Sequence, residues 1–459
     1  MITIGIPDDF TAERTYVIDV LFSEFLGLDY RIITGKSARD YEIILENSRT
    51  LLVRDHFFST FTFKDGTDYL TDRHIPSNIM RCAPNRFSDG ADVPVIFGTD
   101  ELVVERDRII CGIDIFASSF FMLTRWEEYV NRSRDFHNRF PAAESLARKK
   151  GFLHRPVVNE YVEMLWSILT YLKCRQRRKE KTFRTIATHD VDSAFLHATK
   201  SPVEAIRRMG GDFIRRKDPV VALRNFSLWS RIAAGQLRHD PFNTFDHIMD
   251  VSERHGLQST FLFMTDCGRP EYDGNYSITH RFLRRLLADI HARGHEIGLH
   301  SSYESFGDPA RMKMESDRLK TVCLEEGIGQ QRWLSRQHYL RWETPSTFKN
   351  LEAAGIDYDS TLSYAEIAGF RCGVCSEYPA FDILARCRLN VRERPLLVME
   401  CTVIDEGYMG LGTGEKAFSF IKSIKDTCRR FKGDFVILWH NTRLIDPRER
   451  HLYSQILQA

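Results

Sequence analysis

Polar side chains follow five short apolar runs of the sequence, at the point where each run stops. They are carboxylates, imidazoles and a guanidinium: Asp190 and Asp192 in "RTIATHDVDSAF", His300 after "EIGL", Arg336 and His338 in "WLSRQHYLRW", Asp359 in "IDYDS", and His440 after "DFVILW". One carboxylate and two imidazoles form a good site for Zn²⁺ or another divalent transition metal, with open positions for water and substrate. A second carboxylate can act as a general base beside such a site, and a further imidazole as a general acid. The residue types therefore indicate metal-assisted hydrolysis.

The apolar runs belong to a repeated pattern of helix, closing glycine and short strand. "NTFDHIMDVSERHG" predicts a helix that ends at Gly256, before the strand "STFLFM". Likewise, "THRFLRRLLADIHARG" ends at Gly294 before "EIGL", and "GEKAFSFIKSIKDTCRRFKG" ends at Gly433 before "DFVILW". This pattern is typical of β/α units with buried parallel strands. Because the carboxyl ends of such strands share one face, we expect the polar side chains to lie close together.

Length and composition describe a globular protein of two domains. The chain has 459 residues, of which 43% are hydrophobic and 12% aromatic. With 64 Lys and Arg against 63 Asp and Glu, the formal net charge is +1, which argues against nucleic acid as the main partner. The sequence shows no basic segment followed by an apolar stretch at its start and no run of about 18 apolar residues, so we expect a cytoplasmic protein. Scattered cysteines fit a reducing compartment.

The charged stretch "RQRRKEKTFR" predicts a domain boundary near residue 180. Residues 1–180 are expected to form a smaller mixed α/β domain that packs against the second domain and shapes one rim of its cleft. Residues 181–459 are expected to form the β/α domain. An Arg-rich insertion at about 197–243 separates its first two strands, and two interpretations stay open: an amphipathic helical lid, or peripheral contact with an anionic membrane or a lipid-linked glycan.

Residues 181–459 resemble the polysaccharide deacetylase family, the NodB-homology carbohydrate esterases. "THDVD" is similar to a one-residue-expanded form of the family's Thr-Phe-Asp-Asp motif, and "GHEIGLHSS" matches Gly-His-Glu-Ile-Gly-x-His. "SRQHYL", "GIDYDST" and "VILWHN" are similar to the third, fourth and fifth motifs. The resemblance implies a distorted (β/α) barrel of NodB-homology type.

The resemblance also implies roles for individual residues. They are Asp190 as general base, Asp192 and His300 as metal ligands, His440 as general acid, and Arg336, oriented by Asp359, as the group that keeps Asp190 ionised. A backbone N–H, that of Tyr339, would help the metal to hold the oxyanion. Arg371, in "GFRCG", fits a substrate-contacting loop as well as it fits a surface turn.

The sequence departs from the family at one metal ligand. Four residues after His300, where the family has a second histidine, this chain has Glu304. Glu304 could itself be a ligand, His338 could replace the missing histidine from the neighbouring strand, or the metal site could be lost. We favour His338 because "RQHYL" has an imidazole where the family has proline.

These observations together predict a metal-dependent hydrolase that removes an N-acetyl or other acyl group from an amino sugar. The substrate would be a bacterial glycan or its lipid- or nucleotide-linked precursor, and the metal Zn²⁺, with Co²⁺, Ni²⁺ or Mn²⁺ as alternatives. Two alternative functions stay open for this set of residues. One is a non-catalytic carbohydrate-binding or scaffold protein with an incomplete metal site, and the other is a hydrolase of a non-sugar amide.

Overall fold

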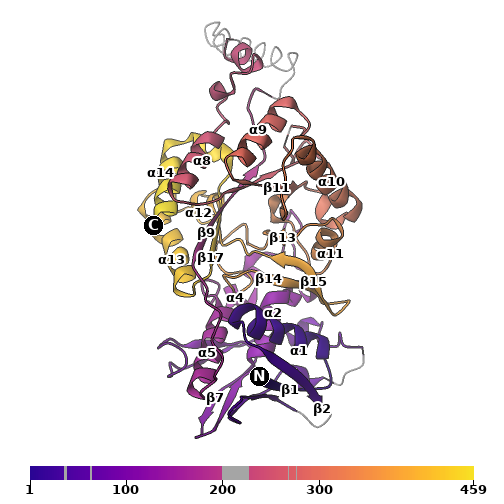
Figure 1. The fold of residues 1–459 in the computed structure, drawn as a ribbon, viewed down its shortest axis with the longest axis vertical. Helices are drawn as coiled ribbons and strands as arrows, with labels where there is room; N and C mark the ends of the chain where they lie inside the picture. The colour runs from indigo at the N-terminus through magenta and orange to yellow at the C-terminus, as the bar shows by residue number, and fades with distance from the viewer. Residues whose placement is uncertain (36–38, 62–64, 199–226, 267, 275) are drawn as a thin grey trace.

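The computed structural model describes residues 1–35, 39–61, 65–198, 227–266, 268–274 and 276–459. Two sheets organise the described chain, one before residue 114 and one from residue 184 onward (Figure 1). Most of the Arg-rich insertion lies outside the described residues, so the two interpretations of that insertion stay open. Within the described part of the chain, no helix combines the length and the apolar character needed to cross a membrane.

The first sheet has six strands among the described residues, in the order β2-β1-β3-β4-β8-β7. They are β1 (Ile2–Pro7), β2 (Tyr30–Gly35), β3 (Tyr41–Ile44), β4 (Thr50–Val53), β7 (Gly98–Val104) and β8 (Arg108–Ile113), and β5 (Met80–Cys82) pairs separately with β6 (Val93–Val95). The accompanying helices are α1 (Thr11–Ile18), the π-helix η1 (Asp19–Leu26), α2 (Ile115–Thr124), α3 (Trp126–Val130), α4 (Leu146–Lys149) and α5 (Val157–Tyr171). Short 3₁₀ turns are η2 (Phe58–Thr60), η3 (Asp72–His74) and η4 (Ala142–Glu144).

The second sheet is a curled, open sheet of nine described strands, in the order β14-β15-β13-β12-β11-β10-β9-β17-β16. They are β9 (Arg184–Val191), β10 (Thr260–Phe263), β11 (Glu296–Ser301), β12 (Leu334–Gln337), β13 (Tyr358–Asp359), β14 (Tyr378–Asp382), β15 (Cys387–Glu393), β16 (Val398–Met399) and β17 (Asp434–Leu438). All neighbouring pairs are parallel except β14 with β15. The predicted α/β class with parallel strands is therefore present, as a half-barrel between the edge strands β14 and β16.

Helices cover the outside of this curled sheet (Figure 1). They are α8 (Phe245–Arg254), α9 (Arg281–Ala292), α10 (Pro309–Glu325), α11 (Ser346–Ala353), α13 (Glu415–Arg430) and α14 (Pro447–Gln458). The short helix α12 (Glu400–Ile404) and the turn η7 (His338–Leu340) instead follow the carboxyl ends of β16 and β12, and the other short turns are η5 (Leu237–His239), η6 (Ser305–Gly307) and η8 (Asn441–Ile445). The helix α9 illustrates how such a helix is held against the sheet. Its buried residues recur at the spacing of one helix face: Phe282, Leu283, Leu286, Leu287 and Ile290. Burial of these apolar faces fixes the strands, and with them the residues at the strand ends.

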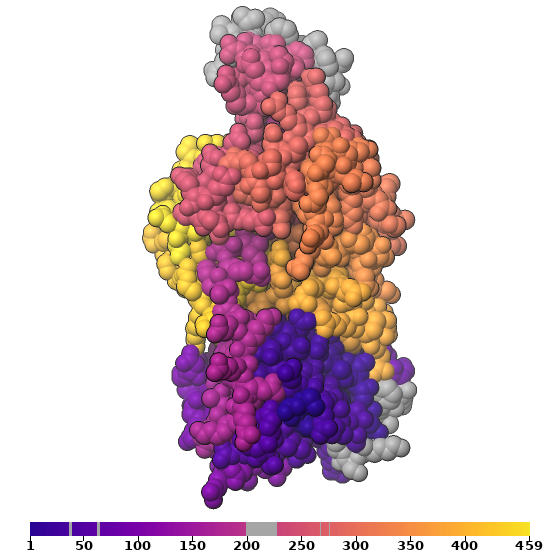
Figure 2. Space-filling view, in the orientation of Figure 1, coloured from indigo at the N-terminus to yellow at the C-terminus, as the bar shows by residue number. Residues whose placement is uncertain are grey.

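The first region, residues 1–180, and the second region, from residue 181 onward, pack directly on one another (Figure 2). Tyr16 of α1 donates a hydrogen bond to the carbonyl of Pro379 (2.7 Å), and its ring lies 4.6 Å from that of Phe381. Tyr378 donates to the carbonyl of Leu123 in α2 (3.0 Å). The antiparallel edge strand β14 is therefore covered by helices of the first region rather than exposed to solvent, as an edge strand needs.

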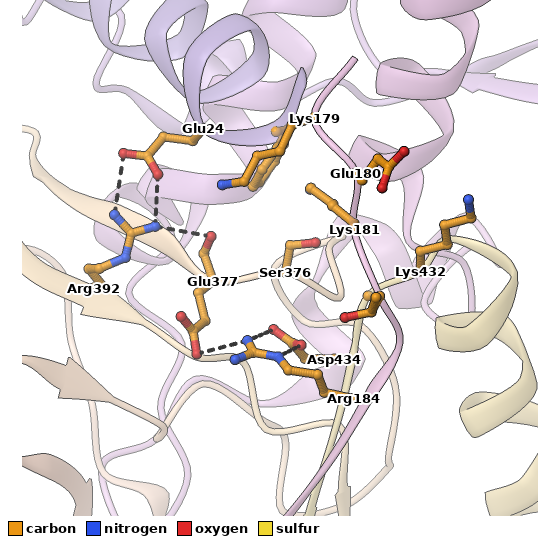
Figure 3. A pocket seen from close by; sticks show the side chains of 13 residues that line it. Glu24, Lys179, Glu180, Lys181, Arg184, Ser376, Glu377, Arg392, Lys432 and Asp434 are labelled. Carbon is orange, nitrogen blue, oxygen red and sulfur yellow. Dashed lines mark hydrogen bonds and ion pairs between the residues drawn. The ribbon is translucent and has the colours of Figure 1, made fainter. Parts of the chain in front are cut away.

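A groove of about 330 Å³ also lies between the two regions (Figure 3). Arg184 pairs with Asp434 (2.7 Å) and Glu377 (3.4 Å), and Arg392 pairs with Glu24 (3.0 Å). Arg184 and Asp434 begin β9 and β17, so this groove lies at the amino ends of the parallel strands. The predicted chemistry lies at the opposite, carboxyl ends.

A buried ion cluster also joins the two regions. Glu128 of α3 accepts hydrogen bonds from Arg125 (2.9 Å) and from Arg371 (3.0 and 2.5 Å). Arg371 is 2% exposed and Glu128 1% exposed. Burial alone would raise the pKa of Glu128, but Arg371 and Arg125 hold that pKa below its usual range. Arg371 therefore does not reach the cleft, which corrects the expectation that it contacts substrate.

Replacing Glu128 by alanine should destabilise the whole chain, because the buried guanidinium of Arg371 would lose its counter-charge and that of Arg125 would keep only Glu127. Breaking a buried pair in this way costs about 3–5 kcal/mol in the free energy of unfolding. Denaturant unfolding measures the change, and Glu144→Ala is the matched control, since Glu144 pairs with Lys149 at the surface. The control should shift stability by no more than about 0.5 kcal/mol. Equal stability of the two variants would contradict the role given to Glu128.

Candidate metal centre and acid–base site

A cleft of about 200 Å³ opens at the carboxyl ends of the parallel strands. Its lining residues are Arg139, Asp190, Asp192, Tyr272, His300, Gln337, His338, Tyr339, Leu340, Met399, Cys401, Tyr408 and His440. Of the residues predicted to act, six line this cleft: Asp190, Asp192, His300, His338, Tyr339 and His440. They come from different strands because the parallel sheet brings the strand ends together.

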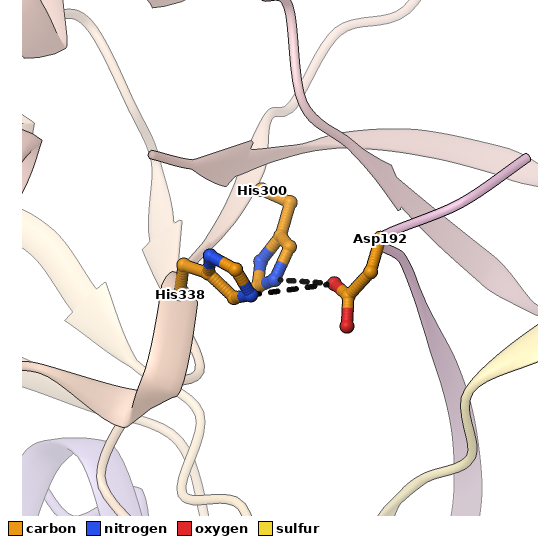
Figure 4. Close-up of side chains that lie close together, drawn as sticks. All are labelled: Asp192, His300 and His338. Atoms are coloured by element: carbon orange, nitrogen blue, oxygen red, sulfur yellow. Dashed lines mark ion pairs between the residues drawn. The ribbon is translucent and has the colours of Figure 1, made fainter. Parts of the chain in front are cut away.

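Asp192, His300 and His338 form a compact group of possible metal ligands (Figure 4). One ligand atom of each lies within 4.8 Å of the others. The Nε2 atom of His300 is 3.3 Å from Oδ1 of Asp192, and Nε2 of His338 is 3.7 Å from the same oxygen. A carboxylate and two imidazoles converging on one point match the ligand types of zinc and related metals.

The two histidines are oriented by hydrogen bonds on their other ring nitrogens. Nδ1 of His300 bonds to the carbonyl of Arg336 (3.0 Å), and Nδ1 of His338 bonds to the carboxylate of Asp273 (3.1 Å). Such partners fix the tautomer and the ring orientation of metal-binding histidines. Asp273 was not found from the sequence, because it lies in the loop between β10 and α9, where no periodic pattern marks it.

The loop that carries Asp273 lies directly against the end of β9. A Cβ atom at Gly274 would lie 2.1 Å from the carbonyl oxygen of Asp192, so only glycine allows this approach. This close approach places Asp273, which bonds to His338, in the same part of the structure as Asp192.

Two buried atoms of the group make no hydrogen bond within the described part of the chain. They are Nε2 of His300 and Oδ1 of Asp192, which face each other as an ion pair at 3.3 Å. Burial tends to raise the pKa of Asp192, but His338, His300 and His440 hold it well below its usual range, so Asp192 is ionised. Unpaired polar atoms are costly in a protein interior. A bound divalent cation would satisfy both atoms, so these residues fit a metal.

A second group of possible ligands, Glu400, Cys401 and His440, fits a metal less well. Nδ1 of His440 is already bonded to Oε1 of Glu400 at 2.5 Å. Burial, together with Glu400, raises the pKa of the Cys401 thiol well above its usual value, which disfavours the thiolate that would bind a metal. The first group is therefore the better candidate for a metal site.

Glu304, the alternative ligand, is not part of the group. Its side chain is 42% exposed, and its carboxylate pairs with Arg269 at 2.7 Å. The geometry therefore brings together the ligand set that contains His338.

Asp190 and Arg336 form a buried ion pair beside the metal ligands. Nη1 of Arg336 donates to Oδ1 of Asp190 at 2.7 Å, and both side chains are almost fully buried. Burial favours the neutral carboxylic acid, but Arg336, His300 and His440 hold the pKa of Asp190 below its usual range. The other oxygen of Asp190 lies 3.8 Å from Nε2 of His300. An ionised carboxylate therefore lies next to the metal group.

The predicted orientation of Arg336 by Asp359 is not what the structure shows. Arg336 donates instead to the carbonyl and hydroxyl of Ser360 and to the hydroxyl of Thr188. Asp359 accepts a hydrogen bond from Thr361 (2.6 Å), and burial raises its pKa to about 6. Asp359 lies beside the buried Glu393, where two carboxyl groups cannot both ionise readily. Asp359 is therefore buried at the end of β13, where it does not line the cleft.

His440 is paired with a carboxylate that was not predicted from the sequence. Glu400 is fully buried at the start of α12, and it accepts hydrogen bonds from both the backbone N–H and Nδ1 of His440 (3.0 and 2.5 Å). Burial lowers the pKa of His440, but Glu400 and then Asp192 and Asp190 outweigh this and raise it to about 10. Glu400 follows the apolar run "LLVM", so the rule that selected the other residues could have selected it.

The comparisons with known proteins cover the chain only in part. Residues 2–173, less than half of the chain, match a family model described as a family of unknown function, DUF7033. No curated protein matches the chain.

Several solved structures of low similarity also align with this chain. A candidate polysaccharide deacetylase from Mycobacterium smegmatis is 17% identical, with a TM-score of 0.40 over 61% of this chain and 84% of its own. The polysaccharide deacetylase Bc1974 from Bacillus cereus is 11% identical, with a TM-score of 0.27 over 61% and 86%. The PuuE allantoinase is 11% identical, with a TM-score of 0.34 over 60% and 83%. TM-scores this low do not establish a shared activity.

Proposed function

We propose that this protein is a metal-dependent hydrolase that removes an N-acetyl or other acyl group from an amino sugar of a bacterial glycan or glycan precursor. The observation that carries the proposal is the arrangement of the cleft. A three-residue metal group, Asp192, His300 and His338, lies between an ionised carboxylate and a protonated imidazole. Amide hydrolysis needs a base for the attacking water and an acid for the departing amine, and the cleft offers one of each.

Asp192, His300 and His338 would hold a divalent cation, with Zn²⁺ the first choice and Co²⁺, Ni²⁺ or Mn²⁺ as alternatives. Such a cation, when bound, supplies Lewis-acid chemistry, because it polarises the amide carbonyl and acidifies water. The low exposure of His300 and His338 keeps bulk water from competing for the ligand positions.

The residues of the chain divide the proton transfers between them. Asp190, kept ionised by Arg336, takes a proton from the attacking water. His440, kept protonated by Glu400, gives a proton to the nitrogen of the departing sugar amine. The backbone N–H of Tyr339 is proposed to donate to the developing oxyanion. Leu340 and Met399 give the cleft an apolar wall for the acyl group, and Tyr272 and Tyr408 give it aromatic faces for a sugar ring.

The amino-sugar substrate rests on the resemblance of the five sequence motifs, and the acid–base arrangement alone would serve any amide. The test is therefore a panel. Protein stripped with a chelator and reloaded with Zn²⁺, Co²⁺, Ni²⁺ or Mn²⁺ is incubated with N-acetylated amino-sugar oligomers, with nucleotide-linked N-acetyl amino sugars and with simple non-sugar amides. Acetate release and mass loss give the readout.

Asp190→Asn is the decisive variant for this proposal. Asparagine keeps the shape of the side chain but cannot accept a proton, so kcat should fall by about 10²–10⁴-fold, while metal content stays the same because Asp190 is not a ligand. Turnover of non-sugar amides alone would show that the substrate class is wrong. Full activity of the variant would contradict the mechanism, and absence of activity in every metal form of the wild type would favour the binding-protein alternative.

A further inference from the structure

A polar segment of the first region, residues 131–140, reaches the rim of the cleft. Nη1 of Arg139 donates to the carbonyl of Tyr339 at 3.1 Å, and the His137 ring lies 4.6 Å from the Tyr339 ring. In return, Nε of Arg341 donates to the carbonyl of His137 at 2.9 Å. Arg139 also lines the cleft. Two contacts from the first region therefore reach the residue that directly follows the proposed metal ligand His338.

The backbone at this point adopts an unfavourable conformation. Tyr339 and Leu340 have φ angles of 58° and 56°, in the left-handed region that residues with a side chain rarely adopt. Two such residues in succession persist only where surrounding contacts impose them. The turn is closed by the N–H of Arg341, which donates to the carbonyl of His338 at 3.3 Å. The Tyr339 carbonyl, at the centre of the turn, is held by Arg139.

Arg139 is itself held in place by hydrogen bonds within its own segment. Its Nε and Nη2 atoms each lie 2.8 Å from Oδ2 of Asp135. The other carboxylate oxygen of Asp135 accepts the backbone N–H groups of His137 and Arg139, at 2.9 and 2.8 Å. The segment is thus a small preorganised loop, and the guanidinium loses little freedom when it contacts Tyr339.

We propose that Arg139 is a positioning residue for the metal site. Its hydrogen bond to the Tyr339 carbonyl holds the left-handed turn that directs His338 toward Asp192 and His300. The first region therefore contributes a residue that shapes the metal site. This inference rests on the proposed function only in taking the ligand of His338 to be a metal ion. The contact by which Arg139 fixes the turn does not depend on that function.

The experiment compares Arg139→Ala and Arg139→Lys with Arg132→Ala. Arg132 is an exposed residue of the same segment, whose guanidinium lies over the Tyr129 ring at 4.6 Å. Co²⁺ affinity is measured by equilibrium dialysis against a chelator, and backbone hydrogen exchange is followed in peptides covering 334–344 of the metal-free protein. Arg139→Ala should bind Co²⁺ about 10-fold more weakly, as expected when a group supporting a metal ligand is removed. The Arg341 N–H should exchange faster in that variant.

Arg139→Lys should recover part of both effects, since one ammonium can reach the Tyr339 carbonyl but cannot also reproduce the paired contact with Asp135. Arg132→Ala should match the wild type in both measurements. Unchanged exchange in folded Arg139→Ala, or faster exchange with unchanged Co²⁺ affinity, would overturn the proposal. If Arg139→Ala does not fold, Arg139→Lys and Asp135→Asn decide by the same two measurements. A wild type that binds no Co²⁺ would refute the proposed function, while hydrogen exchange would still decide whether Arg139 holds the turn.

Discussion

Replacing His338 by alanine is expected to abolish stoichiometric metal binding. His338 supplies one of three converging ligand atoms, and the two that would remain, from Asp192 and His300, cannot form the three-ligand site of a catalytic zinc. Removing a direct ligand should weaken binding by more than the roughly 10–100-fold seen for supporting groups. His300→Ala should have the same effect. Elemental analysis of the purified variants and Co²⁺ dialysis measure the loss, and hydrolysis should disappear with the metal.

Glu304→Ala is the matched control for this prediction. Glu304 occupies the sequence position of the family's second histidine, but its carboxylate is partly exposed and pairs with Arg269. The variant should therefore keep its metal and most of its activity. The reverse pattern, with metal lost from Glu304→Ala and kept by His338→Ala, would show that the ligand set is wrong.

Replacing Glu400 by glutamine is expected to move the alkaline limit of activity to lower pH. Glu400 is the main cause of the raised pKa of His440, about 10 in the absence of a cation. His440 must be protonated to act as an acid, so activity is present below this pKa and is lost as pH rises through it. Glutamine removes the negative charge and lets the pKa fall toward the ordinary histidine value of about 6.5. A bound cation lowers the pKa in both proteins alike, so the difference between them remains.

The same pair contributes to folding stability, and the sign follows from the same pKa. A histidine with a raised pKa stabilises the fold fully below its unfolded value of about 6.5 and loses this contribution as pH rises through the folded value.

The kcat profile from pH 6 to 10 tests the predicted shift of the alkaline limit of activity. Glu406→Gln is the control, because Glu406 is an exposed glutamate near the same helix. His440→Ala should lower kcat by about 10²–10⁴-fold at pH values below the pKa of His440. An identical alkaline limb in Glu400→Gln and the wild type would contradict the pairing.

Short-range pattern alone indicated four of the thirteen residues that line the cleft. Apolar runs of four to eight residues predict buried strands, and a polar residue at the end of such a run marks the point where the chain leaves the sheet. Asp190, Asp192, His300 and His440 were found in this way, because parallel strands all present their carboxyl ends on one side. Glu400 follows the same rule after the four-residue apolar run "LLVM", of which only Val398–Met399 form the strand β16.

The choice among alternatives needed the tertiary structure. His338 and Glu304 are both near His300 in sequence or register, and only the course of η6 and η7 places the imidazole in the group and the carboxylate outside it. Similarly, sequence could not assign the partner of Arg336, because a guanidinium near several carboxylates and hydroxyls pairs with those that its buried geometry allows. The expected partner, Asp359, is instead beside Glu393.

The amino-acid sequence alone indicates the strand ends and the types of chemical group that they carry. The periodicity of a strand and the end of a helix are local properties, set by neighbouring residues. The contact of Arg139 with Tyr339, 200 residues away, and the burial of Arg371 against Glu128 become visible only in the folded chain. Those contacts depend on loop conformations and on the docking of two separate sheets, and no local pattern in the chain encodes either of them.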